Sequence, residues 1–183
     1  MSGNTSPRRK LYVLLTKPHG VRSGAVGLAT RFYYTHSSIG LEEDPNTFYS
    51  FVCKGFIVEK IDRYLKPDRA PFPCKLYELE VSEETYERVR EVIMTYVENR
   101  ADLRYTWFGV ITSIFHIPFR QKNHYFCSQF VAEVLDRSQA ARLKKSCALY
   151  HPRDFKNIQG MKELFQGNLQ LMREHFLRQA CLA

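Results

Sequence analysis

The first half of the chain is a series of strand-like segments, and these constrain the fold more than any other feature of the sequence. Residues 10–16 (KLYVLLT) are a short continuous apolar run, which is typical of a buried strand. Residues 35–42 and 47–59 also predict strands, and the turn-forming residues 43–46 between them predict a β-hairpin. Residues 74–81 (CKLYELEV) alternate between polar and apolar side chains and predict another strand. The fold must therefore contain a sheet, and an aromatic content of 14% favours the same conclusion.

Helical patterns dominate from residue 82 onward. Ser82, followed by Glu83 and Glu84, is a capping pattern, and apolar residues at helical spacing continue this helix to about Asn99. Similar spacing predicts further helices over residues 105–115, 127–136 and 162–181, the last of them amphipathic. Less regular segments predict a short helix at 23–34 capped by Ser23, an extended loop at 65–74, and a helix start at 151–154 with Asp154 as its cap.

The bulk composition indicates a single globular domain. The chain has 183 residues, of which 44% are hydrophobic and 25% charged, and this is enough to build a substantial core. Residues 1–9 are polar and predict a disordered N-terminus, so the domain is expected to span residues 10–183 and to carry an amphipathic helix at its C-terminal end. Five cysteines, an odd number without regular spacing, indicate a reducing compartment rather than a disulfide framework.

The formal net charge of +8 is compatible with several partners, and the scatter of the basic residues favours a solvated surface. Without a basic stripe interleaved with aromatics, nucleic-acid binding is not expected, and binding to an anionic membrane surface is equally disfavoured. The apolar run at 11–15 is too short for a signal sequence, and the apolar segment at 107–119 is too interrupted to span a membrane. We therefore expect a cytoplasmic protein with no integral membrane association.

Cys127 is the first candidate for chemistry because it stands between a polar loop and a predicted amphipathic helix. The positive end of a helix dipole favours a thiolate over a thiol, and first-turn amides can hold an oxyanion. The alternative interpretation is a small buried apolar residue, which is the common role of a free cysteine.

A thiol nucleophile needs a base, and His36 is the best placed of the six histidines. It begins a predicted strand that continues through Ile39 and Leu41, and a strand is a rigid mount for a base. His124 is nearer to Cys127 in sequence, but it precedes the helix and is expected to face solvent.

Metal binding is the competing use of these side chains. His124 and Cys127 form an H-x-x-C pair, which is half of a zinc site. The other half would come from cysteines that lack a paired spacing: Cys53, Cys74 and Cys147. We therefore expect neither a metal nor another cofactor.

Two segments resemble the motifs of permuted NlpC-type, papain-like proteins, which include YiiX-like hydrolases. Residues 124–131 (HYFCSQFV) resemble the nucleophile motif of that group and are also similar to the Cys-x-x-Phe-Val of lecithin:retinol acyltransferase relatives. Residues 35–41 (THSSIGL) resemble the histidine strand, and residues 48–51 (FYSF) the strand after it. Residues 150–155 (YHPRDF) resemble a segment that follows the nucleophile helix in bacterial members. The histidine precedes the cysteine here, as it does in the permuted group.

The resemblance implies an α+β, permuted papain-like fold, with an antiparallel sheet or a small barrel packed against helices. It also implies that Cys127 is the nucleophile and His36 its base, and that the reaction passes through an acyl-enzyme thioester. In relatives a polar residue on the next strand orients the histidine. Here Ser50 is the best candidate for that role, with Thr47 and Glu42 behind it, and a hydroxyl would be a weaker orienter than a carboxylate.

The implied function is that of a thiol hydrolase or acyltransferase acting on a peptide, amide or lipid-acyl substrate through an amide, ester or thioester bond. The weak third residue favours an alternative, a catalytically weak or inactive binding module of the same fold. The aromatic segment at 105–119 is expected to line an acyl pocket or, more commonly, to belong to the core.

Overall fold

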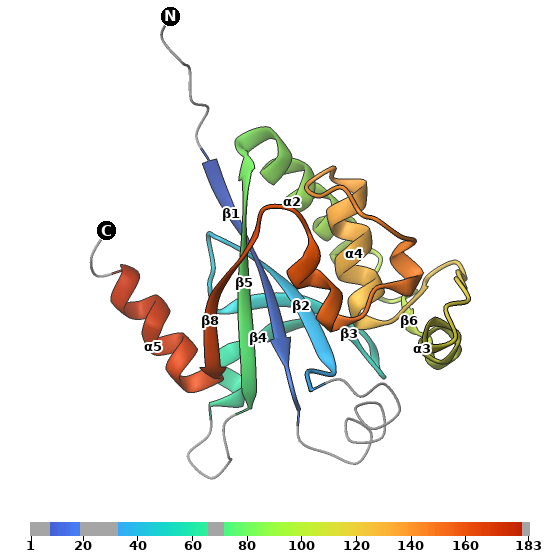
Figure 1. Ribbon diagram of the computed structural model, residues 1–183, viewed down its shortest axis with the longest axis horizontal. Coiled ribbons are helices and arrows are strands. Elements are labelled where there is room, and N and C mark those ends of the chain that lie inside the picture. The colour runs from blue at the N-terminus through green and yellow to red at the C-terminus, as the bar shows by residue number, and fades with distance from the viewer. Residues whose placement is uncertain (1–7, 19–32, 66–71, 181–183) are drawn as a thin grey trace, which may run out of the picture.

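A six-stranded antiparallel sheet in the order β4-β3-β2-β1-β5-β8 organises the computed structural model, which describes residues 8–18, 33–65 and 72–180 (Figure 1). The expected α+β class is confirmed, and of the two expected architectures the open sheet is the one formed. Its strands are β1 (Arg8–Thr16), β2 (His36–Leu41), β3 (Thr47–Val52), β4 (Gly55–Lys60), β5 (Pro73–Ser82) and β8 (Met161–Asn168).

Helices cover both faces of this sheet. The longer ones are α2 (Glu83–Glu98), α3 (Trp107–Ile114), α4 (Cys127–Arg137) and α5 (Leu169–Ala180). Short elements complete the described fold: the 3₁₀ helices η1 (Ile61–Tyr64), η2 (Cys147–Leu149) and η3 (Pro152–Asn157), and a parallel pair of β6 (Arg104–Tyr105) and β7 (His124–Tyr125). Figure 1 shows α2 and α4 on one side of the sheet, α5 on the other, and α3 beside the sheet at the edge of the molecule.

β1 lies inside the sheet and is buried on both faces, which explains its continuous apolar run. Leu11, Val13 and Leu15 face the core beneath α2 and α4, whereas Tyr12 and Leu14 face the smaller core beneath α5. Successive side chains on a strand point to opposite faces, so a strand covered on both sides needs apolar residues at every position. The strand begins at Arg8, somewhat earlier than expected.

α2 confirms the capping prediction. The Ser82 hydroxyl accepts a hydrogen bond from the Thr85 amide at 3.2 Å, and the helix buries Tyr86, Val89 and Ile93 on one face. The helices expected at 105–115 and 127–136 are also present, as α3 and α4.

The segment at 47–59 is two strands rather than one. β3 ends at Val52 and β4 begins at Gly55, with a tight turn at Cys53 and Lys54. Gly55 has φ +103°, and a Cβ there would meet the Leu103 carbonyl at 2.7 Å, so only glycine fits without strain. The sheet therefore contains a second hairpin that the sequence interpretation missed.

The prediction of an amphipathic helix over residues 162–181 is wrong for the first part of that segment. Residues up to Asn168 form β8, which pairs with β5 along the sheet edge. α5 begins only at Leu169, and the Asn168 side chain caps it by accepting a hydrogen bond from the Leu171 amide at 3.0 Å. Pairing with β5 outweighs the helical preference of this segment.

Asp154 is not the cap of its helix. η3 starts at Pro152, so His151 stands at the cap position, and Asp154 reaches back to accept a hydrogen bond from the His151 amide at 2.8 Å. The helix expected at 23–34 lies almost entirely outside the described residues, as do the centre of the loop expected at 65–74 and most of the expected disordered N-terminus. No helix among the described residues is both long and apolar enough to cross a bilayer.

Candidate active site

Cys127 is the first residue of α4, at the end of the helix that packs against β2 and β3. Phe126 occupies the cap position, and its side chain makes no capping hydrogen bond. The amides of the first turn are therefore not taken by a capping side chain, and the positive end of the helix dipole acts on the thiol.

β2 brings His36 to this thiol from the early part of the chain. His36 is the first residue of β2, and its ring lies close enough to the Cys127 thiol for each group to shift the pKa of the other. The Cys127 Sγ also lies 4.0 Å from the carbonyl oxygen of Thr35, the residue just before the strand. The structure thus brings together the two residues that the sequence interpretation paired.

Glu59 is the partner of the His36 ring on its other side. His36 Nε2 donates to Glu59 Oε1 at 2.7 Å, and the Glu59 side chain is only 6% exposed. Because Nε2 is bound to the carboxylate, Nδ1 is the nitrogen that remains for the sulfur. The three side chains form a buried chain of thiol, imidazole and carboxylate, the arrangement of a nucleophile, its base and an orienting group.

The residues expected to orient His36 have other partners. Ser50 Oγ donates to the carbonyl of Ser37 at 2.6 Å, so it supports the backbone of β2 beside the histidine rather than the ring. Thr47 bonds to Asp44 and Lys60, and Glu42 accepts from Arg9. The orienting position belongs to β4, one strand farther along the sheet than expected.

A sequence signal for Glu59 was present. A strand over 47–59 would be much longer than the usual 5–6 residues, and Cys53-Lys54 followed by Gly55 in its centre is compatible with a short hairpin turn. Splitting the segment there would have placed Glu59 on its own strand, opposite Phe48.

The electrostatics of the site favour an ion pair. Burial lowers the pKa of His36, but the Glu59 carboxylate, together with the hydrogen bond and charge of Cys127, outweighs burial and raises that pKa well above its ordinary value. Burial has the opposite effect on Cys127 and raises the pKa of the thiol. The interaction with His36 and the hydrogen bonds from Ser37 outweigh burial and bring this pKa below its ordinary value. Thiolate and imidazolium are thus the mutually favoured forms.

Ser37 supports the sulfur from the strand. Its backbone and hydroxyl each lower the pKa of Cys127 by hydrogen bonding. The hydroxyl is buried and makes no other hydrogen bond among the described residues, and its effect on the sulfur is smaller than that of the backbone.

A pocket of about 180 Å³ opens on the carboxylate side of the histidine. His36 and Glu59 form part of its wall, and most of the remainder is apolar, including Leu14, Phe72 and Leu169. Cys127 is 7% exposed and does not line this pocket. The pocket therefore reaches the base and its orienter and stops short of the sulfur.

His124 does not serve the thiol. Its Nδ1 hydrogen-bonds to the carbonyl of Lys122 at 2.8 Å, within its own loop. In the part of the chain that the structure describes, no three His, Cys, Asp or Glu side chains are grouped so as to hold a metal ion. The zinc arrangement of His124 and Cys127 with other cysteines is therefore not formed there.

α3 neither lines an acyl pocket nor packs its large side chains into the core, the two roles expected for the aromatic segment at 105–119. Tyr105, which precedes it, lies near the thiol: burial raises its pKa, and the charge of Cys127 raises it further. Tyr105 also packs edge-on against Trp107, with ring centroids 5.1 Å apart. Beyond this point the large side chains of α3 are exposed, so they neither line an acyl pocket nor belong to the core.

Comparison with known proteins shows a fold relationship alone. No family model matches the chain, and no curated protein matches it. Among solved structures it is similar to a crystal structure described as the metalloprotein YiiX, DUF1105, from Escherichia coli O157:H7. The two chains share 11% identity with a TM-score of 0.61, and the match covers 87% of this chain and 97% of the other.

The residues described here do not fit a metal at the candidate site, because the His36 ring is engaged by Glu59 and Cys127.

Proposed function

We propose that this protein is a cysteine-dependent hydrolase or acyltransferase that acts on an amide, ester or thioester through an acyl-enzyme intermediate at Cys127. The observation that carries the proposal is the buried chain from the Cys127 thiol through His36 to Glu59, with a 2.7 Å contact between the imidazole and the carboxylate. The shifted pKa values of both reacting groups support it, because such shifts cluster at catalytic sites.

The reaction begins from the thiolate–imidazolium pair. The sulfur attacks the carbonyl carbon of the substrate and forms a carbon–sulfur bond, while the carbonyl electrons move to oxygen. The tetrahedral intermediate then expels the leaving group, which takes the proton of His36. Water or another acceptor attacks the resulting thioester, His36 removes its proton, and the thiolate is released with the imidazolium restored.

The start of α4 supplies the counterpart for the developing negative charge on oxygen. The amide of Cys127 points out of the first turn, where no capping side chain competes for it. A fixed amide donor at this point stabilises an oxyanion without reorganisation.

Glu59 favours an active enzyme over a binding module. A carboxylate stabilises an imidazolium more strongly than a hydroxyl does. With Glu59 rather than Ser50 as the residue that orients His36, the imidazolium is strongly stabilised. Glu59 acts through His36 and is a positioning residue.

Trapping the acyl-enzyme tests the proposal. The protein is incubated with a small thioester and with a p-nitrophenyl ester, and intact-mass and peptide-mass spectrometry then locate any acyl group. We expect acylation at Cys127 that Cys127→Ser removes, and no such loss for Cys53→Ser, which changes an exposed thiol. A chain that never acylates with either substrate, and whose Cys127 alkylates no faster than Cys53, is a binding module instead.

A further inference from the structure

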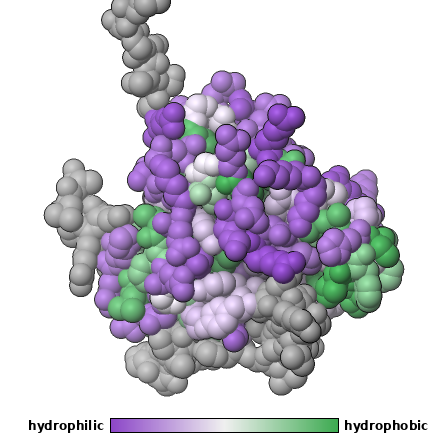
Figure 2. Space-filling view, viewed as in Figure 1, coloured by the Kyte–Doolittle hydropathy of each residue, from purple (hydrophilic) through white to green (hydrophobic). Residues whose placement is uncertain are grey.

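α3 and the loop after it expose a cluster of large apolar side chains, which we call the α3 patch. Figure 2 shows it as the hydrophobic area over α3. Phe108 is 59% exposed and Phe115 is 70% exposed. The α3 patch consists of Trp107, Phe108, Ile111, Phe115 and Ile117.

The amphipathicity of α3 is inverted relative to an ordinary surface helix. Its buried residues are the small or polar Gly109, Thr112 and Ser113, and the two hydroxyls bond to carbonyls within the helix itself. The large apolar side chains face away from the protein, although a helix normally buries them. An exposed apolar cluster of this kind marks a surface that meets another apolar phase.

Basic residues border the α3 patch, and acidic ones are missing from its chain segment. From Leu103 to Ala132 the sequence has no Asp or Glu. Arg104, Arg120 and Lys122 are exposed, and the structure records no ion pair for them among the residues it describes.

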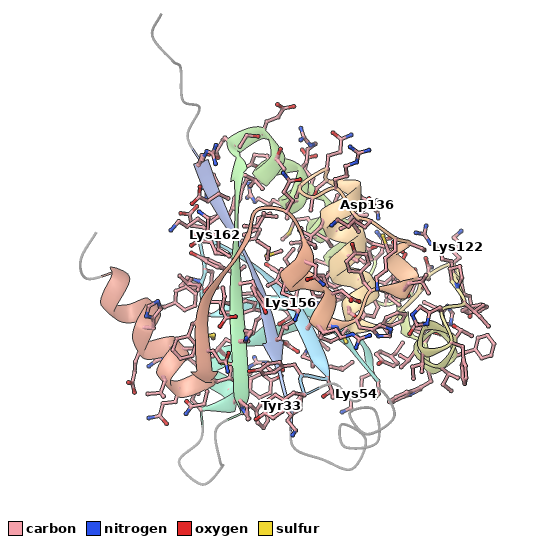
Figure 3. The ribbon with its side chains drawn as sticks, in the orientation of Figure 1. Tyr33, Lys54, Lys122, Asp136, Lys156 and Lys162 are labelled. Carbon is pink, nitrogen blue, oxygen red and sulfur yellow. The ribbon has the colours of Figure 1, made fainter. Side chains whose placement is uncertain are left out.

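Contacts hold these charges beside the patch. Phe108 and Phe119 pack with ring centroids 4.7 Å apart, which fixes the loop that carries Arg120 against α3. Arg104 pairs with His124 through β6 and β7, just before the helix begins. Figure 3 shows Lys122 at the outer edge of the molecule, on the side of α3.

We propose that the α3 patch docks on the surface of an anionic lipid bilayer, with its aromatic and aliphatic side chains in the interfacial region. Arg104, Arg120 and Lys122 then face the phosphates of the headgroups. Aromatic side chains together with basic residues are the composition of peripheral membrane elements. In a second copy docked symmetrically on this patch, the same three cations would be brought to one interface, which disfavours a dimer.

The buried face of α3, opposite to the α3 patch, adjoins the candidate active site. Gly109 of α3 lies against Phe126, the residue before Cys127, and the Thr106 amide donates to the Tyr125 carbonyl at 3.1 Å. Docking would therefore place the first turn of α4 behind α3, about one helix diameter of 10 Å from the bilayer surface. The proposal stands independently of the thiol chemistry, so Cys127→Ser is expected to bind vesicles as the unaltered protein does.

Vesicle sedimentation tests the proposal. The protein is mixed with vesicles of phosphatidylcholine alone or of phosphatidylcholine with phosphatidylglycerol, and binding is measured over a range of lipid and salt concentrations. We expect binding to the anionic vesicles that weakens as salt rises. Phe108→Ser combined with Phe115→Ser should weaken it at least tenfold, because the exposed rings no longer enter the interface. Leu171→Ser is the matched control, since Leu171 is 50% exposed on α5.

A charge-reversal pair tests the electrostatic half. Arg120→Glu and Lys122→Glu should each weaken binding to anionic vesicles about fivefold or more, whereas Arg63→Glu, at an exposed position of η1, should not. Equal binding to both vesicle types, or binding that survives the double Phe substitution, overturns the proposal. A failure to bind either type of vesicle also overturns it. If sedimentation velocity then reveals a dimer that Phe115→Ser dissociates, the α3 patch binds a second copy of the chain instead of a bilayer.

Discussion

Replacing Glu59 by Gln removes the negative charge beside His36 while keeping the size of the side chain. The carboxylate accepts a 2.7 Å hydrogen bond from the imidazole, and the two side chains are 6% and 12% exposed, so water screens this contact little. Opposite charges about 4 Å apart at an effective dielectric constant of about 20 interact by about 4 kcal/mol, which is an upper bound because Gln keeps an acceptor. Hydrogen bonds to charged groups contribute about 1.5–3 kcal/mol in practice.

This loss of interaction free energy can be measured as a change in the alkylation rate of Cys127. A loss of about 1.5–3 kcal/mol in the thiolate–imidazolium pair reduces the thiolate population, and hence the alkylation rate of Cys127 near neutral pH, by roughly tenfold to a hundredfold. The assay is iodoacetamide labelling followed by peptide mass spectrometry from pH 5 to pH 9, a range that brackets the ordinary histidine pKa of about 6.5. Exposed Cys53 in the same sample is the internal reference.

The expected pH profile has a definite direction. In the unaltered protein Cys127 should react at a pH below that of an ordinary thiol, because His36 lowers its pKa against the effect of burial. Glu59→Gln should move the onset of reactivity to higher pH. Ser50→Ala is the matched control, since Ser50 bonds to the Ser37 carbonyl and not to the ring, and its profile should keep the same midpoint. An unchanged profile for Glu59→Gln, or a shifted one for Ser50→Ala alone, refutes the assignment of Glu59.

Three further substitutions test the architecture around the site. Glu59→Ala should lower the free energy of unfolding by about 3 kcal/mol at low pH, because a buried imidazolium is left unpaired. Since the pKa of His36 is raised in the folded state, its pairing with Glu59 stabilises the protein fully below pH ~6.5. The loss should fade as pH rises through that raised pKa, and urea titrations at several pH values measure it. Gly55→Ala should destabilise by about 1–3 kcal/mol, measured in the same way, because φ is +103° and the new Cβ would lie 2.7 Å from the Leu103 carbonyl; an unaffected midpoint would contradict the described turn. Ser82→Ala should cost about 1 kcal/mol through loss of the α2 cap, while Thr95→Ala, at an exposed position in the last turn of that helix, should cost less.

The sequence predicted those parts of the fold whose local pattern and final environment agree. Leu11 to Leu15 are apolar on both faces of a strand covered on both sides, and Ser82 caps a helix whose Tyr86 and Val89 turn to the core. In each case the local preference and the tertiary contacts favour the same structure.

Where the two disagree, the sequence interpretation went wrong. The segment that ends at Asn168 contains good helix formers, but β5 offers it a strand partner from a distant part of the chain, and no local pattern records that pairing. At the candidate site, Cys127 and His36 were predicted from helix-start chemistry and motif resemblance, and the structure places them side by side. Glu59 was missed because one overlooked turn at Gly55 concealed the strand that carries it.

β8 is made last of the six strands, although it completes the edge of a sheet whose interior is built from the earliest segments. Until it leaves the ribosome, backbone groups along the outer side of β5 have no partner, and a bare strand edge is a template for pairing between chains. α4 and the Cys127 thiol emerge earlier in synthesis, while the sheet still lacks this cover. The nascent chain is therefore prone to aggregate in the interval between the synthesis of β5 and that of β8, when chaperone protection would matter most.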